Sequence, residues 1–315
     1  MAALSTTPSI PSPSSFEPIR YSEDELSAIR EVRTLLLSKG IAESRIGLCT
    51  LAVATINTKL RVEETAKKYM KWLEALETFQ IEGLGGNDGA LWNPAVAPML
   101  RSYAPCGKDK DGRSIFWIRG GSIQPEEEKA SILCGAMYFL AIHGDNRSLH
   151  EGITFVIDVA RQPAKKVGNE AKLQKVWQSF PLRPQRIFIA GASMVKRVFI
   201  NGLLKVAWFF TKQKILDRIL FADMAEVLAE VPLESAPSYV GGGGGRGGGA
   251  GDGGAHDGAA LASSPEDPKE KPSGGGVGEG GLLSLTTGDP ELDRETRELA
   301  AWVKQRLEQF PIPEL

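Results

Sequence analysis

Residues 153–160 read ITFVIDVA, and this unbroken apolar run decides the fold class. A strand that is apolar on both faces is typical of a parallel or mixed sheet covered on both sides. Outward from this run, further strands are predicted at 114–119 (SIFWIR), 186–191 (RIFIAG) and 215–222 (ILDRILFA), with helices at 126–143, 165–179 and 225–231. This alternation predicts an α/β domain built on a mixed or parallel sheet covered by helices.

The chain before this sheet has a helical pattern. Ser22 and Glu25 form a capping box that begins a helix ending near Gly40. Apolar residues at helical spacing predict two more helices near 48–56 and 63–79, and Asn93-Pro94 begins a short one. These patterns define a helical N-terminal lobe at 21–82. Residues 1–20 are rich in Ser and Pro, and we expect them to be disordered.

Two changes of composition follow the α/β domain, which we place at 92–242. Residues 243–288 consist largely of Gly, Ala, Ser and Pro, which predicts a flexible linker with nothing to bury. Asp289-Pro290 then begins a C-terminal amphipathic helix within 289–315. We expect its apolar stripe to dock on the main body or on a protein partner. The stripe consists of Leu292, Leu299, Trp302, Val303 and Phe310.

Several chemistries lack their signatures in the sequence. The three Cys and three His have no metal-site spacing, so we expect no metal and free thiols in a reducing compartment. The glycine run lacks the phosphate-loop and dinucleotide fingerprints. Asp158, at the end of the central strand, has a catalytic and a structural interpretation, and the absence of a visible partner favours the structural one. We expect no catalytic residue, no cofactor and no enzyme activity.

Positive charge is concentrated in one segment. Residues 161–218 carry 13 Lys or Arg and two acids, a net charge of +11, whereas the whole chain is −2 with a pI of about 6.1. Such a segment favours an anionic surface, either nucleic acid or anionic lipid. Residues 198–210 within it predict an apolar helix, too short to cross a bilayer, beside a polar stripe of Arg197, Asn201 and Lys205. This helix is either a core element or a cover over an apolar ligand that also touches a membrane.

An ordered set of segments resembles a known family. They are DKDGRSIFWIR (109–119), GITFVIDVARQ (152–162), SFPLRPQRIFIAGAS (179–193), KQKILDRILFAD (212–223) and SAPSYVGG (235–242), with the apolar helix before the fourth. Over about 92–242 this set resembles the CRAL-TRIO lipid-binding domain, and residues 43–80 are similar to that family's N-terminal helical lobe. The resemblance implies a sheet that forms the floor of an apolar lipid cavity, closed by a mobile helix that moves at the membrane.

The resemblance implies two groups of site residues. The lipid cavity and its lid would be lined by Phe116, Phe155, Ile157, Phe188, Phe199, Leu203 and Phe209. Headgroup or membrane binding would involve Arg183, Lys196, Arg197, Lys205, Lys212 and Arg218. In phosphoinositide-binding members a Glu-Arg pair follows the Pro of the third segment, whereas here Leu182-Arg183 follows it, and Arg218 stands where those members have Lys. Which lipid fills the cavity, and whether it is a phosphoinositide, therefore stays open.

The leading hypothesis is a non-enzymatic, cytoplasmic protein, peripherally associated with membranes, that binds a lipid and transfers or presents it. One alternative is a nucleic-acid-binding protein that uses the same basic segment. Another is a scaffold whose C-terminal helix recruits a protein partner. Both of the first two would bind electrostatically, but only the lipid carrier needs an apolar cavity. We expect a lipid ligand and an anionic membrane as partners, and no nucleic acid.

Overall fold

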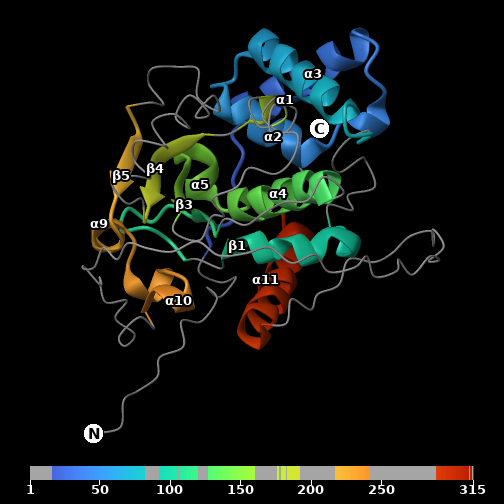
Figure 1. Cartoon of the computed structure of the whole chain (residues 1–315). Helices are drawn as coiled ribbons and strands as arrows, with labels where there is room; N and C mark the ends of the chain where they lie inside the picture. The colour runs from blue at the N-terminus through green and yellow to red at the C-terminus, as the bar shows by residue number, and fades with distance from the viewer. Residues whose placement is uncertain are drawn as a thin grey trace, which may run out of the picture.

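The computed structural model of the chain describes residues 16–81, 92–104, 107–119, 127–159, 176, 179–181, 183–191, 217–241, 289–311, 313 and 315. Its centre is a five-stranded sheet in the order β1-β2-β3-β4-β5 (Figure 1). The strands are β1 (Tyr103–Ala104), β2 (Ile115–Ile118), β3 (Ile153–Asp158), β4 (Pro184–Ala190) and β5 (Ile219–Ala222). β1 is antiparallel to β2, and all other neighbours are parallel. The predicted mixed α/β sheet is therefore confirmed.

The register of the parallel strands gives the sheet two faces. Phe116 pairs with Phe155, and Phe155 pairs with Ile187, so these three side chains point to the same side. We call this side the α4 face, because α4 (Glu128–His143) packs on it. Trp117 and Val156, each one residue further along, pair with each other and point to the opposite side. We call that side the α9 face, after α9 (Met224–Glu230).

A row of aromatic rings joins the α4 face to the helical lobe. The ring of Phe116 lies 5.2 Å from that of Phe155 and 6.3 Å from that of Phe139 on α4. Phe139 lies 4.7 Å from Phe180, and Phe180 lies 5.3 Å from Trp72 of the lobe. These pairs include edge-on arrangements, which aromatic quadrupoles favour. The lobe and the sheet therefore share one continuous core.

The helical lobe consists of α1 (Glu23–Ser38), η2 (Glu43–Arg45), α2 (Leu48–Asn57) and α3 (Val62–Glu77). The predicted capping box is confirmed, because Ser22 Oγ accepts from Glu25 N at 3.3 Å and Glu25 Oε2 accepts from Ser22 N at 2.8 Å. Residues 49–56 of α2 are all buried, and α2 packs on α1, α3, α4 and α5 (Asn146–Glu151). α2 thus lies between the rest of the lobe and the α/β domain (Figure 1).

The α9 face is covered by the chain that follows β5. α9, η6 (Leu233–Ser235) and α10 (Ser238–Gly241) lie there at the outer end of the sheet (Figure 1). Asp223 caps α9, and its side chain accepts from Glu226 N at 2.8 Å. The buried apolar residues of this second core are Ala104, Ile115, Trp117, Val156, Phe188, Ala190, Ala222, Val227, Val231 and Ala236.

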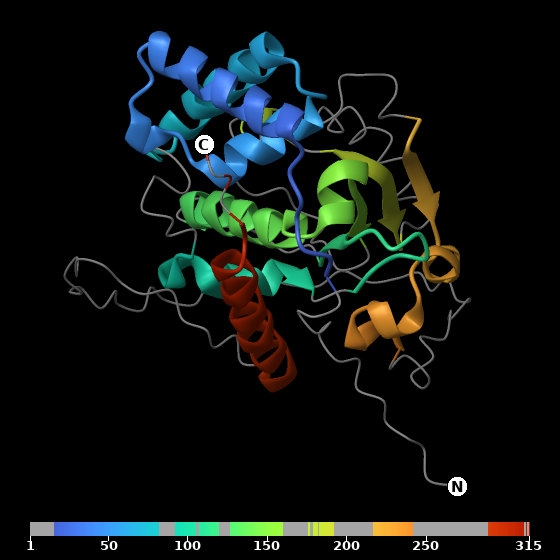
Figure 2. The same cartoon turned by 180° about the vertical axis from the view of Figure 1, so that it is seen from behind.

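The C-terminal helix α11 (Pro290–Glu308) docks on the body of the protein, against α4 and η3 (Pro94–Ser102) (Figure 2). Asp289 caps it as predicted, accepting from Glu291 N at 3.0 Å and from Leu292 N at 3.2 Å. The sequence left open whether this helix docks on the main body or on a protein partner, and in the structure it docks on the main body. The predicted linker at 243–288 and most of the predicted helix at 165–179 lie outside the described residues. No helix in the part of the chain that the structure describes has the length and apolar character needed to cross a bilayer.

Residues 16–20 differ from the expected disorder of 1–20. Glu17 N donates to Asp145 Oδ1 at 2.8 Å, and Arg20 N donates to Asn146 Oδ1 at 3.1 Å. Phe16 and Ile19 are buried, 7% and 8% exposed. The composition of 1–20 did not predict this packing of residues 16–20. Two apolar side chains among Ser and Pro are enough to anchor a short segment once the rest of the fold provides a surface for them.

A first prediction concerns Gly152, which joins α5 to β3 with φ +95°. A Cβ there would collide with the carbonyl oxygen of Arg183, whereas a Cβ on Gly40, with φ +82°, would meet nothing within 4 Å. We expect Gly40→Ala to cost about 1 kcal/mol through its backbone conformation alone. Gly152→Ala should lower the free energy of unfolding at least twice as much in urea titrations. Equal losses would contradict the collision.

A second prediction concerns His143, which is fully buried at the end of α4 with its ring 3.9 Å from that of Phe139. The pKa of His143 is lowered to about 4, mainly by burial and in small part by the Arg183 charge, against the opposing effects of the Phe139 carbonyl and Asp145. An unfolded His titrates near 6.5, so the unfolded state binds the extra proton between about pH 6.5 and 4. Stability should therefore fall as the pH falls through that range.

The measurement is the free energy of unfolding at pH 7 and pH 4.5, for the natural protein and for His143→Gln. We expect the natural protein to lose up to about 3 kcal/mol more than the variant over this interval, since one pKa unit corresponds to about 1.4 kcal/mol. Parallel losses in the two proteins would show that His143 is not the group responsible.

Candidate functional site

An apolar patch lies on the α4 face, at the carboxyl ends of β3 and β4 and along the short strand β5. Ile157 pairs with Ile189, and Ile189 pairs with Phe221, so the three side chains form a row across β3, β4 and β5. Val159 and Ile189 are buried, and Ile157, Ile219 and Phe221 pack on them half-buried. We call these five residues the strand-end patch. Carboxyl ends of parallel strands are the usual position of ligand sites in α/β sheets.

The predicted cavity residues divide into three groups. Ile157 belongs to the strand-end patch. Phe116 and Phe155 lie on the same face but are packed beneath α4, with Phe116 5.0 Å from the ring of Tyr138. Phe188 points to the opposite face and is buried against α9 residues. Phe199, Leu203 and Phe209 of the predicted lid lie outside the described residues.

The patch residues that the prediction missed are Val159, Ile189, Ile219 and Phe221. The strands are apolar on both faces, so the sequence offers no alternation from which to tell the faces apart. The signal that separates them is the pairing register, which puts Ile189 beside Ile157 and leaves Phe188 beside Val156.

The predicted basic residues that the structure describes, Arg183 and Arg218, lie together just before β4 and β5. Arg183 donates to the His150 carbonyl and Arg218 to the Pro184 carbonyl. Burial, then the nearby Arg218 charge, lower the pKa of Arg183, and Glu151 opposes them. At about 3.3 Å per strand residue, Arg183 is some 20 Å along β4 from Ile189. Lys196, Arg197, Lys205 and Lys212 lie outside the described residues.

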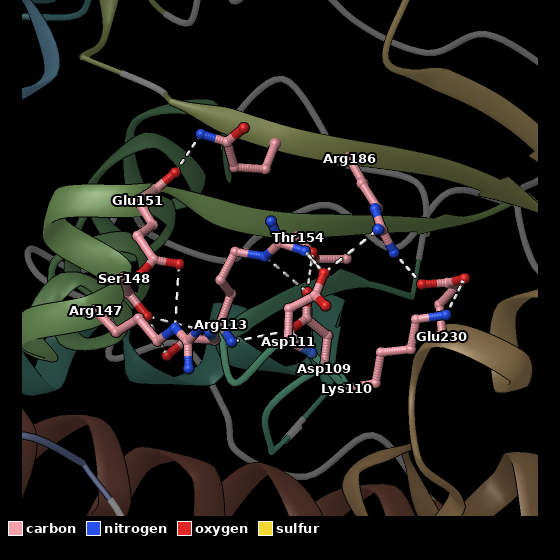
Figure 3. Close-up of polar contacts among 12 residues, drawn as sticks. Asp109, Lys110, Asp111, Arg113, Arg147, Ser148, Glu151, Thr154, Arg186 and Glu230 are labelled. Atoms are coloured by element: carbon pink, nitrogen blue, oxygen red, sulfur yellow. Dashed lines mark hydrogen bonds and ion pairs between the residues drawn. The ribbon is translucent and has the colours of Figure 1, made fainter.

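A network of ion pairs holds the amino-terminal edge of the sheet on the α9 face (Figure 3). Asp109 is buried and accepts from Thr154 Oγ1 at 2.7 Å and from Arg113 N at 2.8 Å. Arg186 pairs with Asp111 at 3.3 Å and with Glu230 of α9. Glu230 also accepts from Lys110, and this hydrogen bond is the main cause that lowers the pKa of Glu230.

This network reduces the positive charge that the basic segment, residues 161–218, can offer to a partner. Arg186 is one of its 13 positive residues, but its charge is neutralised by two acids from outside the segment. Its role is to tie the turn before β2 to β4 and α9. The positive field that remains for a partner therefore depends on the other basic residues.

Asp158 has a structural partner. Tyr239, from the closing SAPSYVGG segment, donates its hydroxyl to Asp158 Oδ2 at 3.0 Å and accepts from Trp117 Nε1 at 2.8 Å. Burial, followed by the Asp158 charge, raises the pKa of Tyr239, which keeps the phenol protonated as a donor. Asp158 thus anchors the segment that closes the domain.

Comparison with known proteins gives one match. The model of the CRAL/TRIO domain matches residues 102–242, and no curated protein matches the chain. The matched residues contain all five strands, α4, α5, α9 and the Tyr239 segment, while the helical lobe and α11 lie outside them. Residues 102–242 are therefore a CRAL/TRIO domain, and domains of this family bind and transfer lipids.

Proposed function

We propose that this protein binds a hydrophobic lipid over the strand-end patch and transfers it between membranes, or presents it at one, without catalysing a reaction. The observation that carries the proposal is the patch itself. Its residues form a small apolar cluster beyond the main core beneath α4, and Ile157 and Ile219 join the two. Side chains of this kind are suited to an acyl or other hydrocarbon chain and offer no group for chemistry.

The order of the strands supports a lid over the patch. The sheet runs β2-β3-β4-β5 in one direction with all four strands parallel, and the connection from β2 to β3 passes over the α4 face. Parallel crossovers are right-handed in nearly all proteins, so successive crossovers in the same direction fall on the same side. We therefore assign the β4–β5 connection, which contains residues 198–210, to the α4 face, over the patch.

The composition of that connection fits a lid that meets a membrane. Its apolar residues suit the lipid, and Arg197 and Lys205 suit anionic headgroups at the bilayer surface. Arg183 and Arg218 lie at the other edge of the sheet, so we propose that they add to the membrane-binding charge rather than contact the lipid's hydrocarbon. Cytoplasmic location and peripheral membrane association are parts of the same proposal. Leu182, in place of an acidic residue, leaves the identity of the lipid to experiment.

The patch is tested with Ile189→Trp, which adds volume where the lipid would lie. We expect uptake of a pyrene-labelled phosphatidylcholine, and of whatever lipid native mass spectrometry finds co-purified, to fall at least fivefold with little change in melting temperature. In a tightly packed core the same change would cost about 1–3 kcal/mol of stability. The control is Leu220→Trp, at a 47% exposed position on the α9 face of β5. Lost stability with normal uptake per folded molecule would contradict the lipid cavity.

Membrane docking is tested by charge reversal. The four substitutions, made together, are Lys196→Glu, Arg197→Glu, Lys205→Glu and Lys212→Glu. Each positive charge near an anionic surface contributes about 1 kcal/mol, so flotation with phosphatidylserine vesicles should fall more than a hundredfold. The control is the same charge change at exposed positions of the lobe: Arg30, Lys39, Lys67 and Lys71. Unchanged flotation, or RNA capture at the same salt that exceeds vesicle binding, would overturn the docking assignment.

A further inference from the structure

We propose that α11 is a separable ligand of its own domain, docked reversibly in cis on a surface formed by α4, η3, β1 and residues 16–21. This inference is independent of lipid binding. It assigns an interaction surface whose occupant is an amphipathic helix held by specific charged contacts. We call the receiving residues the α11 surface.

The position of α11 in the chain is the first reason. It lies outside the CRAL/TRIO match, and residues 242–288, whose composition predicts a linker, separate it from the last described residue of the domain. Its packing partners are α4, η3 and β1, all far earlier in the chain. Figures 1 and 2 agree that α11 lies across this layer, on the side of α4 away from the helical lobe.

The centre of the contact is aromatic. Trp302 lies 5.6 Å from the ring of Phe16 and 6.4 Å from that of Tyr138. Leu299 and Val303, on the same stripe, are 1% and 0% exposed. A Trp in a desolvated pocket with small apolar neighbours is the usual anchor of a helix that binds in a groove between other elements.

Charged contacts flank this centre on both sides. Glu295, early in α11, pairs with Arg119, and both side chains are buried. Arg119 also donates to the Tyr103 carbonyl at 3.0 Å and lies 5.0 Å from the centre of the Tyr239 ring. Arg306, late in α11, donates to the Gly144 carbonyl and lies 4.3 Å from the centre of the Phe16 ring.

Buried charges of this kind fix register and partner more than they add stability. The desolvation of a buried ion pair consumes most of its Coulomb energy, whereas removal of one partner leaves a buried unpaired charge. An aromatic anchor between two charged contacts is thus the composition of a recognition interface. Tethering supplies an effective concentration on the order of mM, so even a modest intrinsic affinity keeps the surface occupied by the chain's own helix.

The test uses the full chain with a specific protease site in place of residues 262–268. After cleavage, the fragment that carries α11 should remain with the body in gel filtration at about 100 μM and separate from it on dilution to below 1 μM. The body should keep its melting transition after separation. A dye-labelled 285–315 peptide should then rebind to it in fluorescence anisotropy.

Charge variants make the test specific. Glu295→Arg should weaken rebinding at least tenfold, because it puts a second positive charge beside buried Arg119. Glu298→Arg, the same change at an exposed position, should leave rebinding unchanged. The pair Arg119→Glu with Glu295→Arg should recover part of the affinity.

Three results would overturn the proposal. In the first, the fragment and the body cannot be separated without unfolding the body, whichever of the two events comes first. α11 is then an integral part of the core. In another, Glu295→Arg and Glu298→Arg weaken rebinding equally. In the third, the uncut chain is a dimer that becomes monomeric after cleavage, which would assign the docked helix to a second copy.

Discussion

The constraint on which the structure depends is the one-directional order of its parallel strands. β2, β3, β4 and β5 follow one another across the sheet in one direction. Right-handed crossovers between successive strands are therefore all expected on the same face of the sheet. One face therefore receives α4 together with Val176 and Phe180 of the β3–β4 connection, while the other is left to α9 and α10, which come after the last strand. The strand-end patch lies on the same face as α4, which is the face of the proposed lid. The arrangement of the proposed ligand site is thus a consequence of topology as much as of side chains.

Sequence patterns predicted the elements with strong local signals and missed those whose signals come from elsewhere. Three local signals each predicted an element that the structure contains: ITFVIDVA for β3, the Ser22 capping box for α1 and Asp289-Pro290 for α11. Each signal lies within a few residues of the chain. β1 has two residues and α5 has six, and both are too short for a period to be recognised. β1 exists because Tyr103 and Ala104 find partners on β2.

The candidate site was predictable in kind but not in detail. The apolar character of β3 and β4 indicated an interior suited to a lipid, and Ile157, one of the predicted cavity residues, lies in the strand-end patch. Phe188 was grouped with Ile157, although its side chain points to the α9 face. The face to which a strand residue points depends on the register between strands, which residues far apart in the sequence determine. Likewise, the sequence gives Arg186 a charge but not the two carboxylates, from residues 111 and 230, that neutralise it.

The two ends of the described chain meet in space. Tyr21 donates its hydroxyl to the Pro311 carbonyl at 3.2 Å, a bond between residues 290 positions apart, and Phe16 rests against Trp302 and Arg306. During synthesis, Phe16 and Tyr21 therefore emerge from the ribosome long before their partners in residues 302–311. The other partners of this segment, Asp145 and Asn146, are made earlier, as are the helical lobe and the strands of the parallel sheet. Contacts over so long a sequence separation carry a high loop-closure cost, and they can form only once α11 has been made.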